Sequence, residues 1–298
     1  MSVTVRVPAK VNVGLAVGPA RPDGFHDLAN VFLAVGLHDE VTAAPAPGLE
    51  LTCSGPGARQ VPLDGTNLAA RAARLLAGRH GLAPDVHLHI AKDIPVAGGM
   101  AGGSADAAGA LVACDALWGT GTSEAELLDL CAELGSDVPF SLLGGAALGR
   151  GRGELLTPLP VGGTFHWVFA VADGGLSTPA VYREFDRLAQ DRTVPPPEAS
   201  AGLLAALRDG DAAALAAALA NDLQPAALSL RPALADTLAA GRAAGALAAL
   251  VSGSGPTCAF LTADASAATE VAGALTASGT CRTARVTTAP APGATLLP

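Results

Sequence analysis

Aromatic side chains are scarce in this chain. They make up 3% of the residues, and Tyr182 is the single tyrosine. Together with the abundant alanine and glycine, this composition predicts small-residue helices that pack closely on sheets. The few aromatic residues are also informative, because each one is a candidate for a specific contact.

Long hydrophobic runs are also missing. The apolar stretches, including the alanine-rich run from Ala212 to Ala220, are interrupted by Asp, Arg, Gly or Pro. They end well before the roughly 20 residues that a bilayer span requires. Residues 1–10 alternate and lack the hydrophobic segment of a signal peptide. We therefore expect no membrane partner and a cytoplasmic location.

Positive charge and cysteine are both sparse. Eighteen basic residues are scattered among 27 acidic ones, for a net charge of −9, so the chain offers no electrostatic footprint for nucleic acid. The five cysteines are widely spaced without a C-x-x-C pair, which fits neither a disulfide framework nor a zinc site. The six histidines also lack metal-ligand spacing. These absences exclude nucleic-acid binding and a zinc enzyme as working hypotheses.

The length of 298 residues favours two domains with a cleft between them. Residues 144–163 are rich in glycine and proline, so we expect an amino-terminal domain over residues 1–157 and a carboxyl-terminal domain over residues 158–298. Residues 191–200 contain three consecutive prolines and are expected to form a linker.

Hydrophobic periodicity predicts the main strands and helices. Two strands separated by a kink at Pro8 are expected between Val3 and Val17, and two alanine- and leucine-rich helices are expected after the linker. Asn67 and Ser123 are residue types that cap helices. The other expected strands are Val86–Ile90, Phe165–Val171 and Thr257–Leu261, and Leu28–Leu37 is a further apolar stretch after a turn. The other expected helices are Asn67–Arg79, Ser104–Trp118 and Ser123–Gly135.

A glycine-rich loop, Gly98 to Ser104, lies between an expected strand and an expected helix. Free backbone N–H groups and the positive end of the helix favour an anion there, and glycines let the backbone approach phosphates closely. The loop has neither the G-x-G-x-x-G pattern nor the Lys-Ser/Thr ending of a Walker A loop. By itself it remains either a phosphate site or a glycine-rich connection without a ligand.

Two further segments give the loop a context. Pro8-Ala9-Lys10-Val11-Asn12-Val13-Gly14-Leu15 precedes it and Gly253-Ser254-Gly255-Pro256-Thr257 follows it, and in this order and spacing the three resemble the GHMP kinase superfamily. The resemblance implies an α+β, two-domain architecture. Its amino-terminal domain would resemble ribosomal protein S5 domain 2, its carboxyl-terminal domain would be ferredoxin-like, and the active site would lie between them.

Other segments resemble one branch of the superfamily. They are Arg21 to His26, Asn67 to Ala72 and Leu134 to Pro139. In that branch the acceptor is 4-(cytidine 5′-diphospho)-2-C-methyl-D-erythritol, an intermediate of non-mevalonate isoprenoid biosynthesis. The resemblance implies transfer of a phosphoryl group from ATP, with Mg²⁺, to the 2-hydroxyl of this small-molecule substrate. We expect a monomer or a weak homodimer.

The resemblance assigns roles at the ATP end of the site. Asp137 matches the family's candidate base and Lys10 the lysine beside it, a pairing that would keep the carboxylate ionised and stabilise phosphoryl charge. Alternatives are an N-cap role for Asp137 and an ordinary surface position for Lys10. Ser104 would reach the phosphates or Mg²⁺. The residues expected to bind ATP are Asn67, Lys92, Pro95, Val96, Ala97, Gly98, Gly99, Met100, Ala101, Gly102, Gly103 and Ser104.

At the acceptor end, Phe25 and Tyr182 match aromatic residues that stack on the two faces of a cytosine ring. His26 would hydrogen-bond the cytosine edge, although ordinary core packing is an alternative for all three residues. The remaining residues expected to bind substrate are Asn12, Thr178, Gly253 and Ser254.

The glycine loop departs from the family pattern at three positions. Alanines replace glycines at Ala97 and Ala101, and Asp106 stands where a small or amide residue is more usual. An acidic side chain early in a helix suits the helix dipole but would repel phosphate if it pointed inward, so we expect Asp106 to point away.

Two other functions remain open at this point. The same fold could serve a homoserine, mevalonate or sugar kinase, although the segment around Phe25 and His26 argues against this. A catalytically silent nucleotide sensor is also possible, but it leaves the pairing of Lys10 with Asp137 unexplained.

Overall fold

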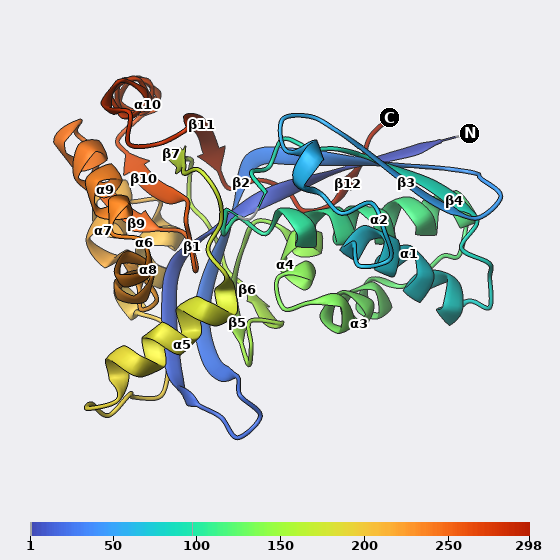
Figure 1. Cartoon of the computed structure of the whole chain (residues 1–298), viewed down its shortest axis with the longest axis horizontal. Coiled ribbons are helices and arrows are strands. Elements are labelled where there is room, and N and C mark those ends of the chain that lie inside the picture. The colour runs from blue at the N-terminus through green and yellow to red at the C-terminus, as the bar shows by residue number, and fades with distance from the viewer. Residues whose placement is uncertain (1, 97) are drawn as a thin grey trace.

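The computed structural model describes residues 2–96 and 98–298. These residues form two β-sheets, one of eight strands and one of four, with helices packed against each (Figure 1). The eight-stranded sheet consists of β1 (Val3–Ala20), β2 (His26–Ala44), β3 (Leu49–Ser54), β4 (Val86–Ala91), β5 (Ala146–Arg150), β6 (Leu155–Pro158), β8 (Ala220–Asn221) and β12 (Thr295–Leu296).

β1 is one continuous strand, so the prediction of two strands separated at Pro8 is wrong. It pairs with β2 in antiparallel register along its length, and the pairing shifts between Pro8 and Ala9. Pro8 lies opposite His38 and Ala9 opposite Val35, so β2 carries two extra residues at this point. A bulge of this kind accommodates a proline that lacks an N–H donor.

The first group of helices packs against the eight-stranded sheet, and α2 lies against both β1 and β2. A Cβ added to Gly109 of α2 would lie 2.8 Å from side-chain atoms of Val7 and Val41, so only glycine permits this approach. The expectation of small-residue helices packed closely on a sheet is confirmed here. These helices are the 3₁₀ turn η1 (Ala58–Gln60), α1 (Leu68–Arg79), α2 (Gly102–Trp118), α3 (Glu124–Leu134) and α4 (Val138–Leu143).

Two of the predicted helix caps are confirmed. The Asn67 side chain accepts a hydrogen bond from the backbone of Ala69, and the Ser123 side chain accepts one from the backbone of Glu126. Each cap satisfies one N–H group that the first helical turn leaves free. The helix after the glycine loop begins at Gly102, two residues earlier than predicted.

The second sheet has the strand order β11-β7-β10-β9, and all its pairs are antiparallel. Its helices lie around it at the left of Figure 1. The strands are β7 (Phe165–Val171), β9 (Ala248–Val251), β10 (Cys258–Thr262) and β11 (Thr283–Ala289). The helices after β6 are α5 (Thr178–Ala189), α6 (Ala201–Asp209), α7 (Ala212–Ala218), α8 (Gln224–Leu230), α9 (Ala233–Ala243) and α10 (Ala265–Ser278).

Four helices, α6 to α9, stand where the sequence predicted two. Gly210, at φ +70°, ends α6, and the Asp211 side chain caps the start of α7. The two-residue strand β8 then separates α7 from α8, and Pro232 precedes α9. Alanine-rich composition therefore concealed the caps and breaks that divide this region.

The chain changes sheets between β6 and β7, near the boundary expected at residues 157 and 158. β8 and β12 later return to pair with β1. The main hydrophobic cluster also joins the sheets, because it contains Val11 of β1 together with Trp167 of β7. The division into two domains at this boundary therefore stays a prediction.

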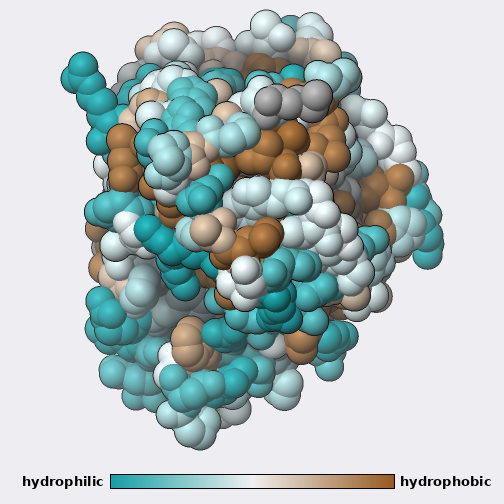
Figure 2. Space-filling view, turned by 90° about the vertical axis from the view of Figure 1, so that its right-hand side faces the viewer, coloured by the Kyte–Doolittle hydropathy of each residue, from teal (hydrophilic) through white to brown (hydrophobic). Residues whose placement is uncertain are grey.

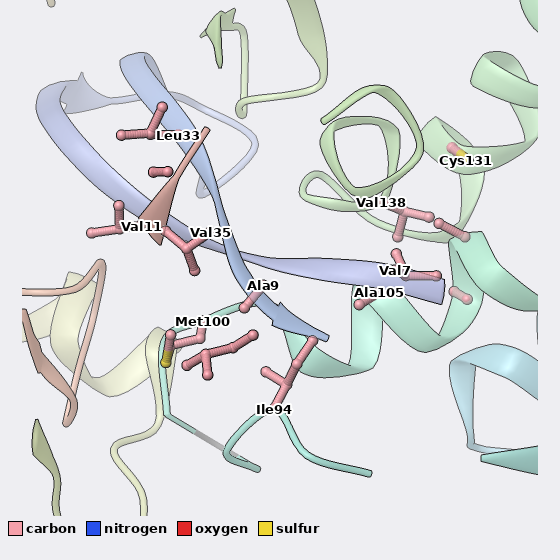
Figure 3. Packing of buried hydrophobic residues seen from close by; sticks show 14 of the residues in the cluster. Val7, Ala9, Val11, Leu33, Val35, Ile94, Met100, Ala105, Cys131 and Val138 are labelled. Carbon is pink, nitrogen blue, oxygen red and sulfur yellow. The ribbon is translucent and has the colours of Figure 1, made fainter. Parts of the chain in front are cut away.

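Figure 3 shows how the hydrophobic core holds the first glycine loop and the segment before it. Ile94 and Met100 lie beside Ala9 of β1, and all three side chains are buried. One apolar side chain before the glycine loop and one within it are thus removed from water, which favours one fixed position for the loop backbone.

Within residues 2–96 and 98–298, no helix has both the length and the apolar character needed to cross a membrane. On the face that carries the α1 and β4 end of the molecule, hydrophobic residues are interspersed with hydrophilic ones (Figure 2).

Candidate active site

A cavity of about 550 Å³ opens between the two sheets. It is lined by β1, β2, the first glycine loop, the start of α4, the start of α5 and the second glycine loop. These segments lie far apart in the sequence, and the fold brings them together. The predicted site residues that line the cavity are Lys10, Asn12, Phe25, His26, Gly98, Gly99, Ala101, Gly102, Gly103, Ser104, Asp137, Thr178, Tyr182, Gly253 and Ser254.

The carbonyl groups of the first glycine loop are held by neighbouring segments. The Gly98 carbonyl accepts a hydrogen bond from the backbone of Thr257 (3.3 Å), and the Gly99 carbonyl accepts from Lys10 Nζ (3.1 Å) and Ser252 Oγ (3.2 Å). The loop leads directly into α2, whose first N–H groups carry the positive end of the helix dipole. The geometry suits an anion at the cavity wall.

The second glycine loop supports the first by direct contact. Gly99 has φ +75°, and a Cβ at this position would lie 2.4 Å from the carbonyl oxygen of Ser252. Gly253 and Gly255 also have positive φ, which favours glycine. The phosphate-site geometry therefore depends on two loops about 150 residues apart.

Ala101 has an unusual backbone conformation. Its φ of 59° and ψ of 29° are left-handed, and among the described residues no other non-glycine has a positive φ. An alanine in this region is strained by its Cβ, whereas glycine is not. The departure from the family pattern at Ala101 thus leaves the loop shape intact at an energetic cost. Ala97, the other departure, lies outside the described residues.

Lys10 and Asp137 meet in the cavity, with Lys10 Nζ 3.5 Å from Asp137 Oδ2. Lys10 is 5% exposed, and its ammonium also donates to Asn12 Oδ1 (2.7 Å) and to the Gly99 carbonyl. Asp137 occupies the N-cap of α4, but its side chain makes no capping hydrogen bond. The carboxylate is one-third exposed and faces the cavity, so the alternative of a simple N-cap is wrong.

Lys92 lies in a second charged cluster, beneath the glycine loop. Its Nζ pairs with Asp39 and with Asp106 (2.7 Å) and donates to the Gly102 carbonyl (3.0 Å). All three charged side chains are buried. Burial opposes the charge of Lys92, but the two carboxylates outweigh this and raise the pKa of the ammonium.

Asp106 points away from the cavity, as expected. Its carboxylate contacts Lys92, and its Oδ1 has no hydrogen-bond partner among the described residues. Burial raises the pKa of Asp106 to about 7, with Lys92 opposing that shift and Asp39 adding to it. One lysine pairs with two buried carboxylates here, so the cluster carries an excess negative charge that an additional proton would neutralise.

The other ATP-binding predictions lie outside the cavity lining. Asn67 caps α1 and also donates to the Pro62 carbonyl, so both ends of its amide are occupied. Met100 is fully buried in the core. The side chains of Lys92 and Met100 are therefore buried on the core side of the loop, and contacts of ATP with these two residues stay predictions. Contacts of ATP with Asn67, Pro95 and Val96 stay predictions, and the same prediction for Ala97 falls outside the described residues.

Aromatic groups gather at one end of the cavity. Phe25 is half exposed, while the Tyr182 ring stacks on His26 with centroids 5.2 Å apart. Burial, aided by the charge of Asp137, raises the pKa of Tyr182, which keeps its phenol neutral. His26 Nδ1 lies 2.8 Å from the Gly18 carbonyl and must donate to it, and its Nε2 lies 3.4 Å from Asp186.

Polar pairs connect the two ends of the cavity. Asn12 donates to Asn30 (2.8 Å), and Thr178 hydrogen-bonds Ser254 (2.9 Å) between α5 and the second glycine loop. Asn30 and Arg152 also line the cavity, although the sequence reasoning did not select them. Asn30, a polar residue in an apolar strand, was a usable signal. Arg152 lies in a glycine-rich turn that carried none.

Comparison with known proteins agrees with this geometry. Residues 67–145 match the family described as GHMP kinases N terminal domain, and residues 203–281 match GHMP kinases C terminal. Together these segments include α1, the first glycine loop, Asp137 and the second glycine loop. The fold and the cavity are those of a GHMP kinase.

The full-length relatives narrow the family. The chain is 80% identical over 297 residues to a 4-diphosphocytidyl-2-C-methyl-D-erythritol kinase of Streptomyces avermitilis, with 100% of both chains covered. A kinase of the same name from Streptomyces coelicolor is 74% identical over 298 residues, again with full coverage. The chain therefore belongs to the 4-diphosphocytidyl-2-C-methyl-D-erythritol kinase family of GHMP kinases.

Solved structures show the same architecture. A crystal structure of a 4-(cytidine 5′-diphospho)-2C-methyl-D-erythritol kinase superposes with a TM-score of 0.78 at 34% identity, over 96% of this chain and 99% of that one. A homoserine kinase from Cytophaga hutchinsonii gives a TM-score of 0.76 at 21% identity, over 99% and 97% of the two chains. The second likeness concerns the fold alone. The predicted α+β, two-domain GHMP kinase architecture is confirmed.

Proposed function

We propose that this protein transfers the γ-phosphoryl group of ATP to the 2-hydroxyl of 4-(cytidine 5′-diphospho)-2-C-methyl-D-erythritol. The observation that carries the proposal is the pairing of Lys10 with Asp137 beside the first glycine loop, in a cavity whose other end is aromatic. The full-length relatives that share up to 80% of the sequence carry the name of this activity. The reaction belongs to the non-mevalonate route to isoprenoid precursors.

Asp137 accepts the proton of the acceptor hydroxyl in this proposal. Its carboxylate is partly exposed to the cavity and makes no capping hydrogen bond, so it can receive a hydrogen bond from substrate. Lys10 is held by Asn12 and Gly99 at the same point, where its charge pairs with the carboxylate and offsets charge on the transferring phosphoryl oxygens.

The glycine loop and the start of α2 hold the phosphates of ATP. Their N–H groups supply hydrogen bonds at fixed positions, and the occupied carbonyls of Gly98 and Gly99 are held away from the anion. Positioning of this kind is the main contribution that a protein makes to phosphoryl transfer.

Mg²⁺ accompanies ATP in this proposal and neutralises charge on the phosphates. Among residues 2–96 and 98–298, no group of three acidic, histidine or cysteine side chains could hold a metal ion. Mg²⁺ commonly takes one or two protein ligands besides phosphate and water, so the donor set suits an ion that arrives with ATP. The Ser104 hydroxyl, at the cavity wall near the start of α2, is the ligand that we assign to it.

The cytidyl group binds at the aromatic end. Phe25 supplies a half-exposed ring for stacking, and Tyr182 supplies a second aromatic surface on the same cavity wall. Because Nδ1 of His26 donates to the Gly18 carbonyl, Nε2 is the ring nitrogen assigned to a hydrogen bond with the cytosine edge. Asn12, Thr178, Gly253 and Ser254 are assigned to the methylerythritol and diphosphate parts.

Turnover of three acceptors tests the proposal. The cytidyl substrate should be phosphorylated with a kcat/KM at least 1,000 times that of homoserine or mevalonate, on the order of the discrimination that buried polar recognition provides. Equal or greater turnover of homoserine would contradict it. Binding of ATP without phosphorylation of any of the three acceptors would instead support a silent nucleotide sensor.

Three further assignments are part of the proposal. The protein works in the cytoplasm, where ATP is available, and acts as a monomer or weak homodimer. The two domains meet near residues 157 and 158. Sedimentation of the purified protein at several concentrations tests the oligomeric state.

A further inference from the structure

We infer that Arg152 binds the diphosphate of the acceptor and thereby selects a nucleoside diphosphate over an uncharged nucleoside. This inference rests on the proposed function and extends it. Arg152 lies in the turn between β5 and β6 and lines the aromatic end of the cavity. Its guanidinium carbon stands 5.2 Å from the centre of the Phe25 ring, the ring assigned to the base.

Elimination among the cavity's positive groups leads to Arg152. The three N–H donors of Lys10 are directed to Asn12, the Gly99 carbonyl and Asp137, so its ammonium is occupied at the other end of the cavity. His26 is fixed by the Gly18 carbonyl and faces Asp186. Among the described lining residues, Arg152 is the cation with donors left for a ligand.

The guanidinium itself has an available edge. Its Nε lies 3.4 Å from Glu154 Oε1, while its two terminal nitrogens have no hydrogen-bond partner among the described residues. These nitrogens form a planar fork that suits two phosphate oxygens. The side chain lines the cavity and is 39% exposed, so the guanidinium is accessible to a ligand.

The turn that carries Arg152 is fixed in place. The Glu154 side chain accepts a hydrogen bond from the Arg152 backbone (2.7 Å), and the Gly151 carbonyl accepts one from the backbone of Leu28 on β2 (2.8 Å). Gly151 and Gly153 both have positive φ, which permits the tight turn. Because the turn is already ordered, less conformational entropy of the chain is lost when a ligand binds.

Charge supplies the reason for a cation at this point. The acceptor carries two phosphate groups, ATP brings further negative charge to the same cavity, and the chain itself has a net charge of −9. An anionic linker placed there without a positive partner would be repelled. The guanidinium lies beside Phe25, the ring assigned to the base. A group at this position is close to the phosphates that extend from the bound nucleoside.

Calorimetry with two probes tests the inference. Cytidine 5′-diphosphate and cytidine are titrated into the full chain with saturating ADP, so that the nucleotide site stays filled. Arg152→Gln keeps the length of the stem and should weaken binding of cytidine 5′-diphosphate about 10-fold to 100-fold. Cytidine binding should change less than about twofold, since an uncharged nucleoside forms no charge-assisted hydrogen bond there. Arg152→Lys should give an intermediate value.

Kinetics and a matched control complete the experiment. Arg152→Gln should raise the KM of the cytidyl acceptor and leave the KM of ATP unchanged. Arg150→Gln removes an exposed arginine two residues away that does not line the cavity, and it should match the wild type. Equal weakening of both probes by Arg152→Gln, or no weakening of either, would overturn the inference. Failure of the proposed function is distinct, since the wild type would then bind neither probe and phosphorylate no cytidyl acceptor.

Discussion

Lys10 and Lys92 are both nearly buried lysines beside the same glycine loop, yet their surroundings differ. Lys92 pairs with two carboxylates that are themselves inaccessible. Lys10 pairs with one carboxylate that is one-third exposed, and its other partners are a neutral amide and a carbonyl. The cluster of Lys92, Asp39 and Asp106 is closed to any ligand, whereas Lys10 and Asp137 present a charged pair to the cavity. Burial of a lysine therefore does not identify its role, but the accessibility of its partner does.

The largest effect is expected where the pair faces the cavity. Asp137→Asn keeps the shape and removes the proton acceptor, so kcat should fall about 100-fold to 10,000-fold. The KM of ATP and the urea midpoint should change little, because the carboxylate makes no capping hydrogen bond. Steady-state kinetics and urea unfolding measure both. A wild-type kcat would refute the role of Asp137.

Substitution in the closed cluster of Lys92, Asp39 and Asp106 should lower the stability of the protein more than it lowers the rate of phosphoryl transfer. Lys92→Met leaves Asp39 and Asp106 buried without a cation, and the free energy of unfolding should fall by about 3–5 kcal/mol. Lys10→Met is the matched control. It should cost about 1–2 kcal/mol, since Asp137 can turn to solvent and the lost hydrogen bonds to Asn12 and the Gly99 carbonyl are the main penalty. Equal losses in the two variants would remove the distinction between them.

A pH series tests the charge imbalance of the closed cluster. The pKa of Asp106 is about 7 in the folded protein against an ordinary 3.8, so between these values the folded state holds a proton that the unfolded state releases. Stability contributed by this group therefore falls as pH rises from about 4 to 7, at up to about 1.4 kcal/mol per pH unit. Asp106→Asn should flatten this slope in urea unfolding. A slope unchanged in the variant would contradict the assignment.

Phe25→Ala tests the aromatic end. Loss of a stacking ring should raise the KM of the cytidyl acceptor about 5-fold to 100-fold and leave the KM of ATP unchanged. Because Phe25 is half exposed, unfolding should shift little. An unchanged acceptor KM would show that the base binds elsewhere.

The smallest effect is expected at Ala101, the strained position of the first glycine loop. Ala101→Gly removes a Cβ from a left-handed residue, which should relieve about 1 kcal/mol of strain, partly offset by the greater freedom of glycine in the unfolded chain. Thermal unfolding should therefore show a small net stabilisation. Ala105→Gly, within α2, is the control and should destabilise by about 1 kcal/mol or more. Destabilisation by both substitutions would argue against strain at Ala101.

Much of the local structure could be predicted because its causes are local. The caps at Asn67 and Ser123, the strand over residues 86–90 and the strand over residues 165–171 follow from periodicity and capping chemistry. The continuity of β1 through Pro8 could not be predicted, because the bulge depends on β2. The division of residues 201–243 into four helices was missed, because alanine-rich composition fits a longer helix equally well.

The scarce aromatic residues, the glycine loop and the motif order by themselves determined the family and the residue types at both ends of the site. Only the tertiary structure decided which charged groups meet. It placed Lys92 with Asp39 and Asp106 beneath the loop, left Lys10 and Asp137 facing the cavity, and brought Arg152 over Phe25. The physical reason is that a motif specifies residue types along the chain, whereas charge pairing and burial depend on segments that the fold brings together.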